Sequence, residues 1–128
     1  MLPLYSASRE VVKKYHPYLA EIGLTYTQYI TMMVMWEEKQ LSVKELGEKL
    51  FLDSGTMTPV LKSLEQKGFV TRNRSEQDER SVIVKITESG EKLKENATEI
   101  PLKVAGCVGL EVEEAKGLYK LLYKILGR

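Results

Sequence analysis

The chain has 128 residues, 43% of them hydrophobic and 29% charged, and its formal net charge is +1. We expect one domain with a buried core, and this net charge neither demands nor excludes a polyanionic partner. The single cysteine, Cys107, excludes an intrachain disulfide and fits a reducing compartment. The sequence has no signal-peptide pattern and no apolar run near the roughly 18 residues of a membrane span, which predicts a cytoplasmic protein without membrane contact.

Three helices are predicted in the first 50 residues. Residues 4 to 22 place apolar side chains three, four and seven positions apart, which is typical of one helical face. Thr25 has Gln28 three residues later, and Ser42 has Glu45, so two capping-box patterns each predict a helix start. The helix after Thr25 is apolar on most sides and is expected to be largely buried.

A fourth helix follows the sequence "LDSG", and its start has two interpretations. Thr58 could cap a helix in which Pro59 is the first residue. Alternatively, the helix begins near Asp53 and tolerates Pro59 early. Because Met57 belongs to the apolar face, the pattern favours the longer helix.

The periodicity then changes to that of a hairpin. Residues 69–74, "FVTRNR", and residues 81–87, "SVIVKIT", predict two strands. The six polar residues between them, "SEQDER", predict the hairpin tip.

Two further helices are expected to complete the chain. Thr87 starts the first, which we expect to be kinked at Pro101 and to end at Gly106. The last helix is apolar nearly all round from Leu118 to Leu126. A terminal helix of this kind needs a second surface to cover it.

The order of elements predicts a mainly α fold with a small β-hairpin, arranged as a winged helix-turn-helix, whose second helix enters the DNA major groove. Between Ser54 and Lys85 lie six basic and four acidic residues, a modest excess. The alternatives are a solvated helix pair beside a structural hairpin, or a winged-helix protein-interaction module without DNA binding, which would not need clustered arginines. The candidate DNA-binding residues are Ser54, Thr56, Thr58 and Lys62 on the helix, and Arg72, Arg74 and Arg80 on the hairpin.

The segment "LDSGTMTPVLKSLEQKGFVTRNRSEQDERSVIVKITESG" resembles the DNA-binding core of MarR-type transcription regulators. "LYSASREV", "GLTYTQY" and "SVKELGEKLFLDSGT" are similar to the branch that senses organic hydroperoxides, OhrR and its relatives, which act in the oxidative stress response. The resemblance implies a single domain over 1–128, with dimerisation helices at 1–24 and 88–128 around a winged helix-turn-helix lobe at 25–87. It also implies a homodimeric regulator, most simply a repressor, whose recognition helices enter major grooves about 34–36 Å apart in a pseudo-palindromic operator.

The resemblance further implies different roles for residues in the wing. Arg80 would reach into the minor groove, where a narrow A·T-rich segment concentrates negative potential. Arg72 and Arg74 are expected to contact phosphates. Asp78 is expected to orient a neighbouring basic side chain, because a carboxylate facing phosphate would be repelled.

The reactive cysteine of the hydroperoxide sensors lies in a pattern like L-C-F-x-L-Y, which matches "MLPLY" here and places Met1 at the cysteine position. Tyr15 and Tyr26 match family tyrosines whose hydroxyls bond that cysteine, and with Tyr5 they form a candidate sensor pocket; ordinary helix packing is the alternative. Three interpretations stay open: a shortened chain, a regulator released by a small molecule instead of an oxidant, or a redox role taken over by Cys107.

Cys107 lies in "VAGCVGL", which we expect to join two helices, so the thiol is expected to be buried and inert. A redox role would need the Cys107 of a second subunit. With His16 as the only histidine, the sequence offers no metal-ligand spacing, and it shows no phosphate loop or paired nucleophile and base. We expect neither a metal, a cofactor nor an enzymatic activity.

Overall fold

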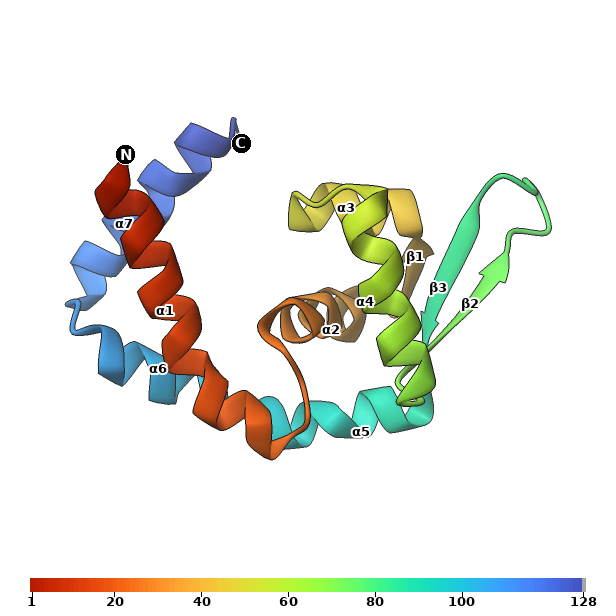
Figure 1. The fold of residues 1–128 in the computed structure, drawn as a ribbon, viewed down its shortest axis with the longest axis horizontal. Coiled ribbons are helices and arrows are strands. Elements are labelled where there is room, and N and C mark those ends of the chain that lie inside the picture. Colours follow the sequence, from red (N-terminus) through yellow and green to blue (C-terminus); the bar gives the residue numbers. More distant parts are fainter. Residues whose placement is uncertain (128) are drawn as a thin grey trace.

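The computed structural model describes residues 1–127. In Figure 1, α1, α6 and α7 lie at one end and form what we call the helical arm, while the elements from α2 to β3 form the lobe. Helix α5 runs below the lobe towards the arm, so that the ribbon is curved. The elements are α1 (Leu2–Glu21), α2 (Tyr26–Glu38), β1 (Gln40–Ser42), α3 (Val43–Leu50), α4 (Ser54–Gln66), β2 (Val70–Arg74), β3 (Val82–Ile86), α5 (Glu88–Ala97), α6 (Ile100–Val108) and α7 (Val112–Leu126).

Both predicted capping boxes are present. The hydroxyl of Thr25 accepts from the backbone N–H of Gln28, and the amide oxygen of Gln28 accepts from the N–H of Thr25. Ser42 and Glu45 make the same reciprocal pair at the start of α3. These bonds satisfy N–H groups that a helix start otherwise leaves without partners.

Helix α4 begins at Ser54, which confirms the longer of the two predicted helices. Asp53 caps it by accepting from the backbone N–H of Thr56 at 2.7 Å. Pro59 lies inside the helix, where it has no N–H to donate. Met57, whose place on the apolar face favoured this start, is fully buried.

The predicted hairpin is the larger part of a three-stranded antiparallel sheet with the order β1-β3-β2. Val84 lies opposite Leu41 of β1 and opposite Arg72 of β2. The sequence prediction missed β1, because a three-residue strand has too little alternation to be recognised. Since β1 directly precedes α3, the sheet fixes the helix-turn-helix to the base of the wing.

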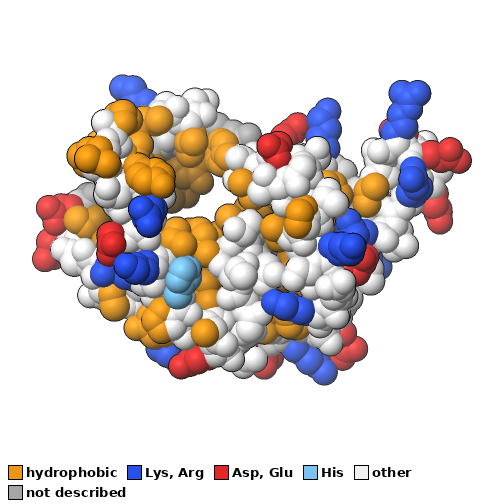
Figure 2. All heavy atoms as spheres, viewed as in Figure 1, with side chains coloured by type: hydrophobic (Ala, Val, Ile, Leu, Met, Phe, Trp, Pro, Cys, Tyr) orange, Lys and Arg blue, Asp and Glu red, His pale blue; other side chains and the backbone are white. Residues whose placement is uncertain are grey.

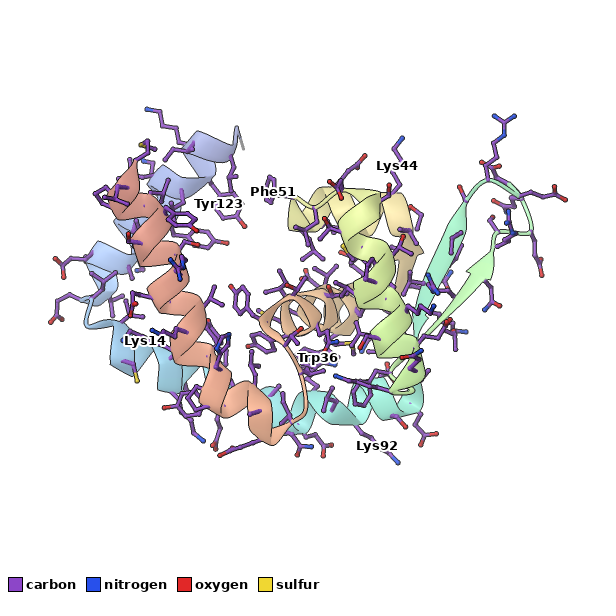
Figure 3. All side chains as sticks on the ribbon, in the orientation of Figure 1. Lys14, Trp36, Lys44, Phe51, Lys92 and Tyr123 are labelled. Atoms are coloured by element: carbon purple, nitrogen blue, oxygen red, sulfur yellow. The ribbon has the colours of Figure 1, made fainter. Side chains whose placement is uncertain are left out.

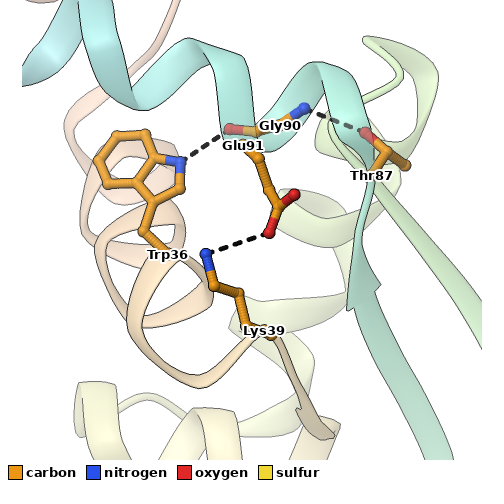
Figure 4. Close-up of polar contacts among 5 residues, drawn as sticks. All are labelled: Trp36, Lys39, Thr87, Gly90 and Glu91. Carbon is orange, nitrogen blue, oxygen red and sulfur yellow. Dashed lines mark hydrogen bonds and ion pairs between the residues drawn. The ribbon is translucent and has the colours of Figure 1, made fainter.

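The lobe has the main core of the chain, and α5 closes it from below. The indole N–H of Trp36 donates to the Gly90 carbonyl at 2.8 Å, and Lys39 pairs with Glu91 at 3.1 Å (Figure 4). A Cβ on Gly90 would lie 2.3 Å from the carbonyl oxygen of Phe69, so only glycine permits this close approach. The core side chains below 1% exposure are Met32, Met35, Leu46, Met57, Leu61, Leu64 and Val84.

The C-terminal part differs from its prediction in two ways. The segment after Thr87 forms two helices, because Pro101 lies in the first turn of α6 and begins that helix instead of kinking a longer one. Helix α6 continues through Gly106 and ends at Val108, and its C-cap Gly109 has a φ of 77°, the left-handed conformation common at helix ends.

Helix α7 is covered by little of the rest of the chain. No residue of α7, all of which the structure describes, is buried. Figure 2 shows hydrophobic side chains gathered over the helical arm and in the hollow between arm and lobe. The large exposed apolar residues of the arm include Leu2, Leu102, Val112, Leu118, Tyr119, Leu121 and Ile125.

Candidate nucleic-acid interface

The predicted polar side of α4 is exposed in the structure. Ser54, Thr56, Thr58 and Lys62 all face solvent, whereas Leu61 on the opposite side is fully buried. The Thr58 hydroxyl donates to the Ser54 carbonyl at 2.9 Å, which leaves its oxygen as an acceptor. Small side chains on this side allow a close approach of a groove or backbone to the helix.

A groove of about 780 Å³ runs between the helix-turn-helix and the wing. It brings together Ser54 and Thr58 of α4 with Arg72 and Arg80 of the hairpin. Lys44 of α3 also lines it, and Figure 3 shows this side chain at the top of the view, pointing away from the lobe. Thr56, Lys62 and Arg74 do not line the groove, although each is exposed.

Lys44 was missed by the sequence reasoning. Its signal was its place in "SVKE", where it is the second residue of the helix that follows the Ser42 cap. Its ammonium adds a positive charge to the lining of the groove.

Arg72 lines the groove and is partly buried. Its guanidinium pairs with Glu65 of α4 at 3.3 Å, and its backbone N–H donates to the same carboxylate at 3.2 Å. Among residues 1–127, the Nε of Arg72 is the one buried side-chain N or O atom without a hydrogen-bond partner. Arg72 thus braces β2 against α4, and its expected contact with phosphate stays a prediction.

The wing tip is ordered by Asp78, in a different way from the one predicted. Its carboxylate accepts from the backbone N–H of Arg80 at 3.0 Å and lies 3.5 Å from the Ser81 hydroxyl. Asp78 therefore fixes the backbone at Arg80, whereas we expected it to orient a basic side chain. The guanidinium of Arg74 donates to the Glu79 carbonyl at 2.8 Å. The tip is held by these bonds while the Arg80 side chain stays exposed.

Two of the three candidate sensor tyrosines lie together. The ring centroids of Tyr15 and Tyr26 are 5.1 Å apart, and Tyr29, which the sequence reasoning missed, lies 5.7 Å from Tyr15. Burial raises the pKa of all three hydroxyls, that of Tyr29 to about 12, so each is neutral at physiological pH. Tyr5 is 62% exposed and lies about 15 Å away along α1. One chain therefore assembles Tyr15, Tyr26 and Tyr29 without Tyr5.

The family model for the transcriptional regulator SarA/Rot matches residues 13–97. The chain belongs to this family. It is 48% identical over 123 residues to the organic hydroperoxide resistance transcriptional regulator of Bacillus subtilis (strain 168), which covers 96% of this chain and 84% of the relative.

Solved structures agree with this SarA/Rot membership. The structure of reduced AbfR bound to DNA has a TM-score of 0.84 and 33% identity, covering 98% of this chain and 88% of that one. A MarR variant from E. coli complexed with operator DNA has the same fold, with a TM-score of 0.86 at 24% identity and coverage of 96% and 90%. The predicted resemblance to MarR-type regulators and the predicted winged-helix fold are both confirmed.

Cys107 of this SarA/Rot member does not have the predicted environment. It lies inside α6, whose helix continues to Val108, and its thiol is exposed. The sulfur is 4.0 Å from the hydroxyl of Tyr18 on α1, and this hydrogen bond raises the pKa of Tyr18. The expectation of a buried thiol was wrong because Cys107 and its small neighbours Ala105 and Gly106 are exposed on α6.

No group of three or more histidine, cysteine or acidic side chains among residues 1–127 is placed to hold a metal ion. Across the same residues, no helix combines the length and apolar character that crossing a bilayer requires.

Proposed function

We propose that the chain is a sequence-specific DNA-binding regulator that acts as a homodimer on a pseudo-palindromic operator, most simply as a repressor. The observation that carries this proposal is the groove shared by α3, α4 and the wing, in which Lys44, Arg72 and Arg80 accompany the hydroxyls of Ser54 and Thr58. Cations positioned beside small hydroxyl side chains suit a phosphate backbone and exposed base edges.

In this proposal each part of the interface has its own task. Ser54, Thr56, Thr58 and Lys62 enter the major groove on α4. Arg80 enters the minor groove, and its backbone position is set by Asp78. Arg74 and Lys44 contact phosphates at the two sides of the groove. The proposal includes no catalytic step, and it places the protein in the cytoplasm with its DNA.

The helical arm supplies the dimer contact in this proposal, through segments 1–24 and 88–128. Exposed apolar side chains on both α1 and α7, including Leu2 at 73% and Leu121 at 60% exposure, support it. Burying them between two copies removes apolar area from water, which is the main driving force of association. Helix α5 would be shared, since Trp36 and Gly90 also fasten it to the lobe.

The release signal is proposed to act at the tyrosine cluster of Tyr15, Tyr26 and Tyr29. Neutral hydroxyls can donate to an oxidised sulfur group or to a polar small molecule. Oxidant and small-molecule release are separated by adding an organic hydroperoxide to the operator complex with and without Cys107→Ser. Release by peroxide that Cys107→Ser abolishes would assign the chemistry to that thiol.

The DNA-binding proposal is tested with Arg80→Ala against Lys92→Ala in a mobility-shift titration. The control, Lys92→Ala, also removes one positive charge, but from α5, which lies on the side of the lobe away from Lys44 (Figure 3). We expect Arg80→Ala to weaken operator binding by about 1–3 kcal/mol and Lys92→Ala to change it little. Equal affinities for wild type and Arg80→Ala would remove the wing from the interface. A wild-type dimer that binds no genomic DNA fragment would instead favour the protein-interaction module.

A further inference from the structure

A polar cluster joins three elements at the end of the lobe near α1. The ammonium of Lys67, at the C-terminal end of α4, donates to the Gly23 carbonyl at 2.6 Å and to the Gln28 amide oxygen at 2.8 Å. The amide nitrogen of Gln28 donates to the Ser63 hydroxyl at 2.8 Å. We call Lys67, Gln28, Ser63 and Gly23 the polar clamp.

Gln28 is the centre of the clamp and is only 6% exposed. Its amide oxygen accepts both from Lys67 and from the backbone N–H of Thr25, while its nitrogen binds Ser63. A buried amide whose oxygen and nitrogen both have partners has one favoured orientation, because a flip would place its nitrogen against the donors Lys67 and Thr25. The turn between α1 and α2 is thereby tied to the last turn of α4.

The place of Lys67 separates it from the residues proposed to contact DNA. Ser54 and Thr58 line the groove, and Lys67 does not. Lys67 follows Ser54 by 13 residues, which is about 20 Å along the helix axis, beyond the Debye length of about 8 Å at physiological salt. Its ammonium instead binds inside the protein, at the C-terminal end of α1, where the helix dipole stabilises a cation.

We propose that Lys67 is a positioning residue that acts through Gln28 to hold the recognition helix α4 at a fixed angle to the α1–α2 turn. Tyr26, a member of the tyrosine cluster, is the first residue of α2 and lies two residues before Gln28. A displacement at that cluster therefore reaches α4 through the clamp. This inference rests on the proposed function, because the quantity that the clamp controls is operator binding by α4.

The test compares Lys67→Met with Lys92→Met in operator titrations at several salt concentrations. Methionine keeps an unbranched apolar chain and removes the ammonium, and Lys92 is an exposed lysine of α5 outside the clamp. We expect Lys67→Met to weaken operator binding about tenfold with an unchanged salt slope, since no phosphate contact is lost. A slope lower by about 0.9 would make Lys67 a phosphate contact, and an unchanged affinity would leave it without a positioning role; either result overturns the inference.

A double-mutant cycle separates positioning from a loss of folded protein. Gln28→Met and Lys67→Met should each weaken operator binding, and the double variant should be little weaker than either, because both break one unit. Thermal unfolding of the same samples establishes that they are folded at the assay temperature. If Lys67→Met fails to fold, Ser63→Ala removes only the acceptor of the Gln28 nitrogen, and unchanged operator affinity of that variant overturns the inference.

The wild-type titration distinguishes the two proposals. If wild type and Lys67→Met bind the operator equally tightly, the positioning role of Lys67 is contradicted, while the proposed DNA-binding function is not. Wild type that binds no operator contradicts the proposed function, and the clamp then has no operator binding to control.

Discussion

The lobe and the helical arm differ in how much of their apolar surface one chain can cover. In the lobe, Leu46, Leu61 and Val84 are fully buried among α2, α3, α4 and the sheet. In the arm, Leu121 and Ile125 are 60% and 63% exposed. Most of the buried core lies in the lobe, with contributions from α1, α5 and α6, whereas the arm also has an apolar face that a second copy can cover. The lobe that we propose to bind DNA is therefore folded in the single chain, whereas bringing two such lobes together depends on dimerisation.

The same substitution in both regions gives the largest expected contrast. Leu61→Ala leaves a cavity in the lobe and should lower the free energy of unfolding by about 2–5 kcal/mol. Leu121→Ala removes an exposed side chain, and in a single chain it should change stability by no more than about 0.5 kcal/mol. Urea denaturation at several protein concentrations measures both.

A second measurement completes this contrast. Sedimentation should show that Leu121→Ala weakens dimerisation, while any folded Leu61→Ala keeps it. A wild-type chain that sediments as a folded monomer at micromolar concentration would contradict the division of roles between arm and lobe.

The attachment of α5 to the lobe provides an intermediate effect. Trp36→Phe removes the buried indole donor of the Gly90 carbonyl and should cost about 1–3 kcal/mol. Lys39→Met removes an ion pair that is about half exposed on both sides, and should cost about 0–1 kcal/mol. Chemical denaturation and amide exchange of α5 would measure both variants, and equal losses would show that the buried bond does not fasten α5.

The smallest expected effect concerns the cap of the recognition helix. The backbone and side-chain hydrogen bonds of Thr56 lower the pKa of Asp53 below its ordinary value of 3.8. Because the folded state favours the ionised form, this contribution is present above pH 3.8 and is lost as the pH falls through the lowered pKa.

Asp53→Asn is the matched variant, since its side-chain oxygen can still cap α4 but does not titrate. The difference in thermal unfolding temperature between wild type and Asp53→Asn should therefore shrink between neutral pH and about pH 3. A difference that does not change with pH would mean that the charge of Asp53 adds nothing to the cap.

Two helix starts were predictable from sequence because each is fixed by residues three positions apart. Thr25 with Gln28 and Ser42 with Glu45 make their bonds within one turn. The hairpin was equally clear from its alternation. Such local signals do not depend on what packs against the element.

Features that depend on tertiary contacts were not predictable in the same way. Strand β1 is recognisable only by its pairing of Leu41 with Val84. The exposure of Cys107 follows from which face of α6 meets α1, and the sequence pattern does not contain that choice. The hydrogen-bond partner of Asp78 depends on the conformation of the tip, where its carboxylate accepts from the backbone N–H of Arg80 and not from a basic side chain.

The uncovered face of α7 has a consequence for how operator occupancy responds to the amount of regulator. No residue of this fully described helix is buried in one chain. If two chains dimerise through α7, the dimer concentration rises with the square of the monomer concentration as long as most chains are monomeric. In that range a twofold rise in protein gives about a fourfold rise in dimer. Titration curves at low concentration would then be sigmoidal even though each operator holds a single dimer.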